Sequence, residues 1–275
     1  MLDAGIGQAR AAVNEASAED DNGMVPFVAM GGSNMRYETG SHVDMKGWNA
    51  AGGFAKQAGK FMYGVAFEYG RGGYDSYLDN GVHASGDVSS TGGVLFGNAK
   101  QADGVHYDAA FRMGRVKSDY TSDVTSYDDG ATYIGFSIGG GKEFKVSAAD
   151  SVDVYGRYYY TRTNGSDVSL ATHEQVLFDA VDSHRLRVGA RYMHDADEKN
   201  QFYAGVAWQY EMGGDAKATI NGYGAPVPSL KGHSGMLELG WKAQAADNVK
   251  LDLNLNGWLG KQRGIAGGVG AEFAF

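Results

Sequence analysis

Over most of the chain, apolar and polar residues alternate with a period of two. The clearest case is 249–260, in which Leu253 and Leu255 fall on one parity and Asp252 and Asn254 on the other. Such alternation is typical of a β-strand whose two faces meet different surroundings. A tilted strand of about 9–11 residues spans a bilayer, so this segment is long enough to cross a membrane.

The same alternation recurs along the chain without a helix-period segment in between. This series predicts an all-β antiparallel fold with an even number of strands. The twelve expected strands are 25–37, 42–57, 60–74, 87–99, 104–118, 131–145, 151–163, 181–194, 200–211, 232–243, 249–260 and 263–275.

The links between these segments alternate in length. Short links near 58–59, 100–103, 146–150, 195–199 and 244–248 alternate with long ones near 75–86, 119–130, 164–180 and 212–231, and the hairpins near 38–41 and 261–262 are short exceptions. Outer-membrane barrels combine short periplasmic turns with longer extracellular loops. The rhythm favours a 12-stranded transmembrane β-barrel over the alternative of a soluble β-sandwich or lipocalin-like barrel.

The first residues follow another period. Leu2, Ile6, Ala9 and Val13 are spaced by four, three and four, which predicts an α-helix. We therefore divide the chain into a helical linker, 1–23, and a barrel domain, 24–275. The opening residues lack the basic and apolar regions of a signal peptide, so a targeting segment is expected elsewhere in the complete protein.

Composition narrows the class of protein. The 275 residues include 43 Gly and 17 Tyr but 3 Pro and no Cys, which favours tightly paired strands and excludes disulfide or thiolate-metal scaffolds. A mean hydropathy of −0.35 and the lack of any apolar run approaching 18 residues exclude a transmembrane helix, but not a barrel that presents every second residue to lipid. The net charge of −9 argues against a nucleic-acid partner.

The last third of the chain carries distinctive motifs. Gly270, Phe273 and Phe275 are similar to the C-terminal signal of outer-membrane barrels, which ends in an aromatic residue. The sequences RLRVGARYMH, QFYAGVAWQYEMGGDAKATINGYGAPVPSLKGHSGMLELGWK and VKLDLNLNGWLGKQRGIAGGVGAEFAF, with GWNAAGGFAKQ nearer the N-terminus, resemble the autotransporter β-domain of type V secretion.

The resemblance implies both a fold and a function. It implies a monomeric barrel in the bacterial outer membrane, with long loops outside, both barrel ends on the periplasmic side and the N-terminal helix in the pore. The implied role is to anchor and translocate an N-terminal passenger that this sequence does not contain. The implied partners are that covalently attached passenger, outer-membrane lipid with its lipopolysaccharide, and the barrel assembly machinery, which reads the C-terminal signal. A small-solute porin and a membrane-embedded hydrolase remain the alternatives.

The candidate site consists of charged residues at the polar positions of the alternating strands. They are expected in the lumen, where charges are ordinary because the interior of a barrel is polar and wet. Alternatively, they grip the linker helix or tune conductance. The set comprises Glu68, Asp108, Arg112, Arg157, Arg185, Arg187, Arg191, Asp252 and Glu272.

No residue pattern in the sequence predicts a catalytic or metal-binding site. His106, Asp108 and Arg112 contain acid–base groups, but no serine nucleophile motif accompanies them, so we expect no enzyme, cofactor or metal. Asp119, Asp123, Asp128 and Asp129 are expected in a solvated extracellular loop, with divalent-cation binding as the lesser alternative.

Self-cleavage in the pore is not expected either. Family members that cut their linker helix do so at an Asn-Asn pair, whereas Asn14, in the predicted helix, precedes Glu15.

Overall fold

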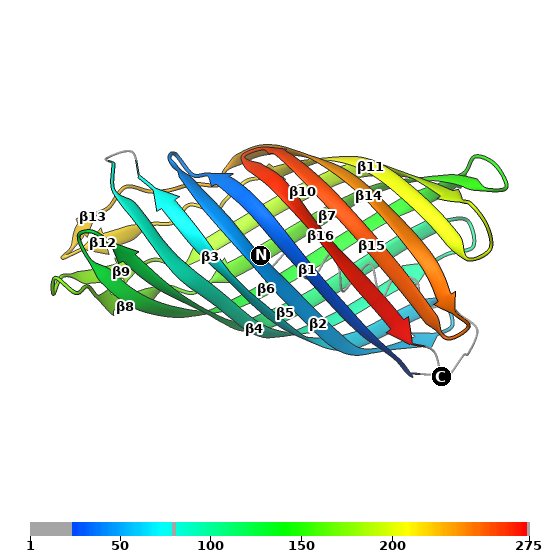
Figure 1. The fold of residues 1–275 in the computed structure, drawn as a ribbon, viewed down its shortest axis with the longest axis horizontal. Coiled ribbons are helices and arrows are strands. Elements are labelled where there is room, and N and C mark those ends of the chain that lie inside the picture. Colours follow the sequence, from blue (N-terminus) through cyan, green and yellow to red (C-terminus); the bar gives the residue numbers. More distant parts are fainter. Residues whose placement is uncertain (1–23, 79–80, 274–275) are drawn as a thin grey trace.

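Twelve antiparallel strands close into a tilted barrel (Figure 1). The structure is a computed structural model that describes residues 24–78 and 81–273. Within these residues each barrel strand pairs with its predecessor and its successor, and β1 closes on β16. In the same residues, no helix is long and apolar enough to cross a membrane. The predicted all-β, 12-stranded antiparallel barrel is confirmed, whereas the predicted helix within 1–23 lies outside the described residues.

The barrel strands follow the period-two segments closely. They are β1 (Met24–Glu38), β2 (His42–Ala58), β3 (Phe61–Tyr77), β4 (His83–Lys100), β5 (Val105–Ser122), β6 (Ser126–Lys145), β7 (Asp150–Thr163), β10 (Val181–Asp195), β11 (Asn200–Glu211), β14 (Gly232–Ala246), β15 (Val249–Gly260) and β16 (Gln262–Phe273).

The first and last strands complete the cylinder. Their register runs from Phe27 opposite Glu272 to Tyr37 opposite Gln262, so the backbone ladder is continuous around the wall. A closed barrel satisfies its backbone hydrogen bonds internally and has no open edge, which is the condition for a sheet to span lipid.

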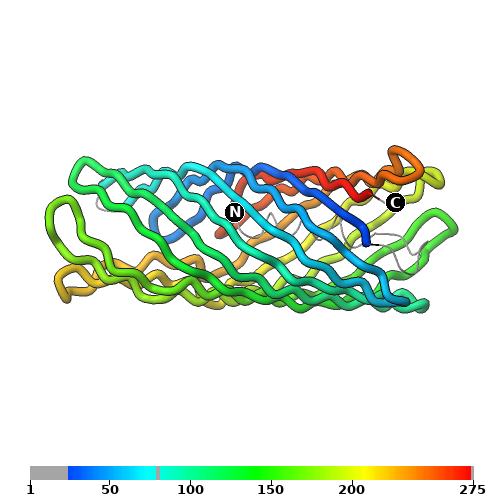
Figure 2. The backbone as a smooth tube through the Cα atoms, turned by 90° about the horizontal axis from the view of Figure 1, so that it is seen from below, coloured from blue at the N-terminus to red at the C-terminus, as the bar shows by residue number. Residues whose placement is uncertain are grey.

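The two ends of the cylinder differ. With an even number of antiparallel strands, β1 begins and β16 ends at the same end, on the right in Figure 1. The opposite end carries four short strands that form a second sheet in the order β13-β12-β9-β8. Seen from below, the tube is long and narrow, with hairpins projecting at both ends (Figure 2).

Two links are much shorter than the sequence predicted. The expected loop near 119–130 is a tight turn, because β5 continues to Ser122 and β6 starts at Ser126. Tyr120 and Tyr127 are register partners whose rings stack with centroids 4.8 Å apart, which stabilises this extension. Polar residues on both faces gave these strand ends the composition of a loop.

The predicted loop near 75–86 is wrong for the same reason. β3 continues to Tyr77 and β4 starts at His83. These two rings stack at 4.6 Å between centroids, and Tyr77 also stacks on His42 at 4.5 Å. Cross-strand aromatic pairs thus extend the wall beyond the segments of clear alternation.

The two longest links contain the second sheet. β8 (Ser166–Ser169) and β9 (Gln175–Phe178) lie between β7 and β10, and β12 (Ala218–Ile220) and β13 (Tyr223–Gly224) lie between β11 and β14. Val168 and Val176 are buried at its centre, so these links have a small core of their own.

The wall has two chemically different faces. In β15, Leu253 and Leu255 are 39% and 52% exposed, whereas Asp252 between them is 5% exposed. Exposed apolar residues alternate with buried polar ones in the same way along other strands, so the outside of the cylinder is apolar and its inside holds the charges.

Candidate functional site

A buried ion pair joins β3 and β5 inside the barrel. Arg112 Nη2 lies 2.7 Å from Oε1 and 2.8 Å from Oε2 of Glu68. The Tyr133 hydroxyl donates to the same carboxylate at 2.7 Å, and the Arg112 guanidinium lies 5.6 Å from the centre of the Tyr133 ring. The two charged side chains are only 4% and 8% exposed, so the carboxylate obtains its hydrogen bonds from protein rather than solvent.

Glycines on the inner face make this cluster possible. Gly92 and Gly114 lie in register between Glu68 and Tyr133. A Cβ atom at Gly114 would lie 2.6 Å from the Tyr133 hydroxyl oxygen, and one at Gly92 would collide with it. The missing side chains form a recess in the wall through which Tyr133 reaches across two strands.

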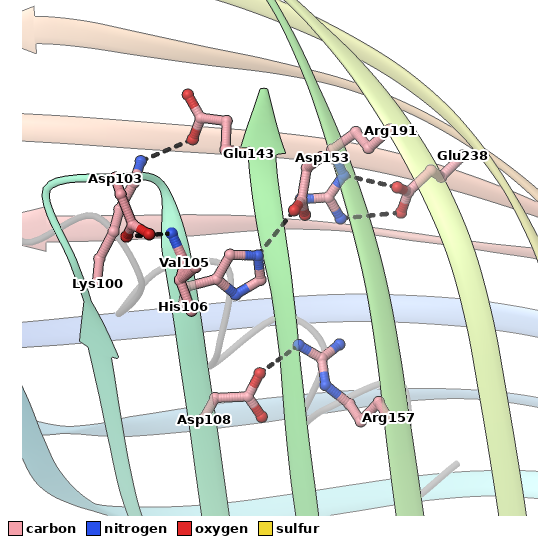
Figure 3. Close-up of polar contacts among 10 residues, drawn as sticks. All are labelled: Lys100, Asp103, Val105, His106, Asp108, Glu143, Asp153, Arg157, Arg191 and Glu238. Carbon is pink, nitrogen blue, oxygen red and sulfur yellow. Dashed lines mark hydrogen bonds and ion pairs between the residues drawn. The ribbon is translucent and has the colours of Figure 1, made fainter. Parts of the chain in front are cut away.

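A second group links β5 to β7 across β6. Arg157 Nη2 lies 2.7 Å from Asp108 Oδ1, and His106 Nε2 lies 2.7 Å from Asp153 Oδ1 (Figure 3). The pairs pass over glycines of β6: a Cβ at Gly139 would lie 2.9 Å from both Arg157 Nε and Asp108 Oδ1. The same use of glycine therefore recurs at the second cluster.

A third group links β10, β11, β14 and β15. Arg191 binds Glu238 through two contacts of 2.6 and 3.1 Å (Figure 3). Its guanidinium lies 4.8 Å from the centre of the Tyr203 ring, and the Tyr203 hydroxyl donates to Asp252 at 3.0 Å. A Cβ at Gly240 would collide with the Tyr203 ring, so this tyrosine also occupies a glycine recess.

Two further arginines on β10 face polar partners. Arg185 Nε lies 3.4 Å from Glu211 Oε2. Arg187 donates to Gln209 at 2.8 and 3.1 Å, and its guanidinium lies 5.1 Å from the ring centres of both Tyr159 and Trp258. These contacts hold an extended row of positive charge against the inner wall.

The structure buries most of the predicted site residues and distributes them over several clusters. Their contact with a linker helix stays a prediction, because 1–23 lies outside the described residues. The residues below 9% exposure are Glu68, Asp108, Arg112, Arg185, Asp252 and Glu272, whereas Arg157, Arg187 and Arg191 are half-buried.

Sequence reasoning missed the acidic partners. Glu238 and Glu211 carry the counter-charges of Arg191 and Arg185, and Asp153 carries that of His106. The signal for Glu238 was present, since it alternates with exposed leucines on β14. The pairing itself depends on barrel register.

The possible acid–base group does not form one centre. His106, Asp108 and Arg112 each contact a different partner, Asp153, Arg157 and Glu68 respectively.

The aspartates expected in one loop are mostly elsewhere. Asp119 belongs to β5, and Asp128 and Asp129 to β6, so only Asp123 lies in the turn. Within the described residues, no group of three or more His, Asp or Glu is arranged to hold a metal ion.

The C-terminal signal is described in part. Gly270 and Phe273 belong to β16. Phe275 lies outside the described residues, and so does Asn14.

Comparison with known proteins gives the family. A barrel with an apolar outside and a charged inside defines a transmembrane β-barrel, and the sequence matches the autotransporter beta-domain family over residues 28–256. The chain therefore belongs to the autotransporter β-domain family. A search of curated proteins gives no match.

Solved structures agree on the fold. The translocator domain of NalP from Neisseria meningitidis has a TM-score of 0.74 at 15% identity, covering 97% of this chain and 94% of its own. The transport unit of AIDA-I from Escherichia coli has a TM-score of 0.74 at 11% identity, covering 100% of this chain and 97% of its own. The β-domain of Bordetella BrkA has a TM-score of 0.71 at 16% identity, covering 93% and 100% respectively.

Membership of the family establishes the function. The chain is an outer-membrane barrel that anchors a passenger and supports its translocation in type V secretion. Translocator domains of this family are non-enzymatic barrels.

Proposed function

We propose that the passenger reaches the cell surface through this barrel, with the sheet of β8, β9, β12 and β13 outside the cell. The main observation in support is that β1 begins at the end of the barrel opposite that sheet. A chain segment that precedes β1 must then pass through the lumen to emerge beside the sheet. The links at the barrel end where β1 begins are short, as are the periplasmic turns of outer-membrane barrels.

The charged interior would hold the linker in transit and afterwards. Residues 1–23 contain five acidic residues and one basic residue, a net charge of −4. The row of arginines on β10 offers complementary charge, and Arg187 and Arg191 keep part of their surface accessible. We infer that a helix in 1–23 lies in the pore against this row.

Bilayer conductance tests the pore assignment. Channels formed by 1–275 are compared with channels formed by 24–275. The truncated barrel should conduct several times more current, because the linker no longer fills the lumen. Equal conductance would instead support the porin alternative.

Cysteine labelling tests the orientation. The sequence contains no cysteine, so a single substitution creates a unique thiol. Tyr223 in β13 is 81% exposed, and Glu198 lies in the turn between β10 and β11. On intact cells a membrane-impermeant maleimide should label Tyr223→Cys and spare Glu198→Cys; the reverse result would invert the orientation.

The remaining roles are structural rather than chemical. We infer a monomer in outer-membrane lipid and lipopolysaccharide, whose C-terminal signal engages the barrel assembly machinery. The interior acids Glu68 and Asp108 are occupied by ion pairs with Arg112 and Arg157, and Asn14 lacks a second asparagine beside it. We therefore expect linker and barrel to remain one polypeptide, as mass spectrometry of the mature protein would verify. A barrel fragment starting at Glu15 and lost in Asn14→Ala would contradict it.

A further inference from the structure

An open groove of about 670 Å³ lies on the outer wall, where β15, β16, β1, β2 and β3 are neighbours. Its side walls are formed by Trp48, Leu255 and Ile265, which are 45%, 52% and 59% exposed. Gly32 and Gly267 form its floor, where outward-facing side chains would otherwise fill the space.

The groove has an apolar end and a basic end. Leu255 and Ile265 belong to β15 and β16, whereas Lys46 and Arg71 belong to β2 and β3. The strands slope along the barrel, so register neighbours from β15 towards β3 lie progressively nearer the end that carries the second sheet (Figure 1). The basic residues therefore occupy the end of the groove that the proposed orientation places towards the cell surface.

Lys46 is open to a ligand, whereas Arg71 forms a long, exposed ion pair with Asp87, which also lines the groove. Within the described residues, no acidic group lies within ion-pair distance of the exposed Lys46 ammonium. Arg71 Nη2 is 3.5 Å from Asp87 Oδ2, and both side chains are about 60% exposed. The neighbouring Arg36 is bound to Asp44 at 2.6 Å and adds no free charge.

We propose that this groove binds one phosphorylated lipid of the extracellular leaflet, with its phosphate at Lys46 and Arg71 and an acyl chain along Trp48 and Leu255. The shape and the charge distribution both favour this occupant. A lipid has an apolar tail and an anionic head at one end, and the groove matches that polarity along its length. Arginine and lysine are the residues that bind phosphate, and tryptophan is enriched at the membrane–water boundary.

The proposal rests on the orientation proposed above, because only the extracellular end presents Lys46 and Arg71 to that leaflet. The binding itself can be measured on purified protein without reference to orientation or passenger. Its failure would leave the cysteine labelling and the translocation role unaffected, so the two proposals are tested separately.

Native mass spectrometry of the full chain folded in detergent provides the test. The probes, added one at a time, are diphosphorylated lipid A, the same lipid without phosphates, phosphatidylcholine and inorganic phosphate. The wild-type protein should retain one diphosphorylated lipid A in preference to each of the others. Equal retention of the dephosphorylated lipid, or equal binding of inorganic phosphate alone, would overturn the proposal.

Three variants locate the site. Lys46→Gln with Arg71→Gln should weaken lipid A retention about thirtyfold, as expected for two basic residues at anionic headgroups. Gly32→Leu should weaken it by filling the groove; a Cβ there would lie an ordinary 3.5 Å from the Gly47 carbonyl oxygen, so the strand accommodates the change. Lys117→Gln, on the exposed face of β5, removes one positive charge outside the groove and should leave retention unchanged.

Heat-modifiable migration on gels confirms that each variant is folded before it is compared. Wild-type retention in either groove variant would contradict the proposal. A loss in Lys117→Gln equal to that in the double variant would also contradict it, since binding would then follow total charge.

Discussion

Glu68 and Arg71 lie three residues apart on β3 and face opposite sides of the wall. Glu68 forms an ion pair with Arg112 at 2.7 Å in which both side chains are at most 8% exposed. Arg71 approaches Asp87 at 3.5 Å, with both side chains about 60% exposed. The strand's parity therefore decides whether a charge stabilises the barrel or remains open to a ligand.

Glycine shows the same contrast on β14. Gly240 faces inward and provides the space that the Tyr203 ring fills. Gly235 faces outward, and a Cβ there would meet nothing within 4 Å. Inner glycines thus allow large polar side chains to cross between strands, whereas outer glycines shape the surface.

The largest effect is expected when the buried ion pair between Glu68 and Arg112 is broken. Glu68→Ala leaves the Arg112 guanidinium buried without its carboxylate, so the free energy of unfolding should fall by about 3–5 kcal/mol. Arg71→Gln on the outer face should change it by about 1 kcal/mol or less, because exposed pairs contribute little. Urea unfolding of the barrel in lipid vesicles measures both, and equal losses would contradict the difference between the faces.

A charge placed on the lipid-facing side of β15 should act almost as strongly. Leu253→Arg puts a cation against lipid and should reduce the free energy of folding into bilayers by about 2–4 kcal/mol. Asn254→Arg points into the polar lumen and should have a much smaller effect. Similar losses in vesicle-folding titrations would rule out a lipid-facing Leu253.

The glycine comparison predicts a smaller difference. Gly240→Ala forces Tyr203 out of its recess and weakens its hydrogen bond to Asp252, so we expect a loss of about 1–3 kcal/mol in unfolding free energy. Gly235→Ala on the same strand should stay within about 0.5 kcal/mol. Equal stability of the two alanine variants would show that the recess is unimportant.

Deleting Phe275 should have the smallest effect on stability. A terminal residue is expected to add little packing. The free energy of unfolding of the assembled barrel should therefore change by less than about 0.5 kcal/mol. The amount of barrel in cells should nevertheless drop, because the C-terminal signal would be incomplete. A normal cellular yield would refute this assignment.

The alternation of residues predicted the barrel because each strand meets lipid on one face and a polar lumen on the other. That signal stops where both faces are wet, so the ends of β5 and β6 around Tyr120 and Tyr127 were assigned to a loop. The strands of the second sheet contain two to four residues, too few for a period to show.

The same limit applies to the interior. Parity placed Arg191 on the lumen side, but its partner Glu238 is 47 residues away and is brought near only by the register of three strands. The recess at Gly240 depends on Tyr203 in the neighbouring strand, and its role cannot be read from β14 alone.

The most direct test of the translocation role is surface display of a reporter. A small, stably folding epitope domain is fused ahead of residue 1, behind a signal peptide, and produced in Gram-negative cells. Folding of the barrel is verified by heat-modifiable migration, and intact cells are then treated with protease. The reporter should be cleaved from the surface while a periplasmic control protein survives; a protected reporter attached to a correctly folded barrel would contradict the account.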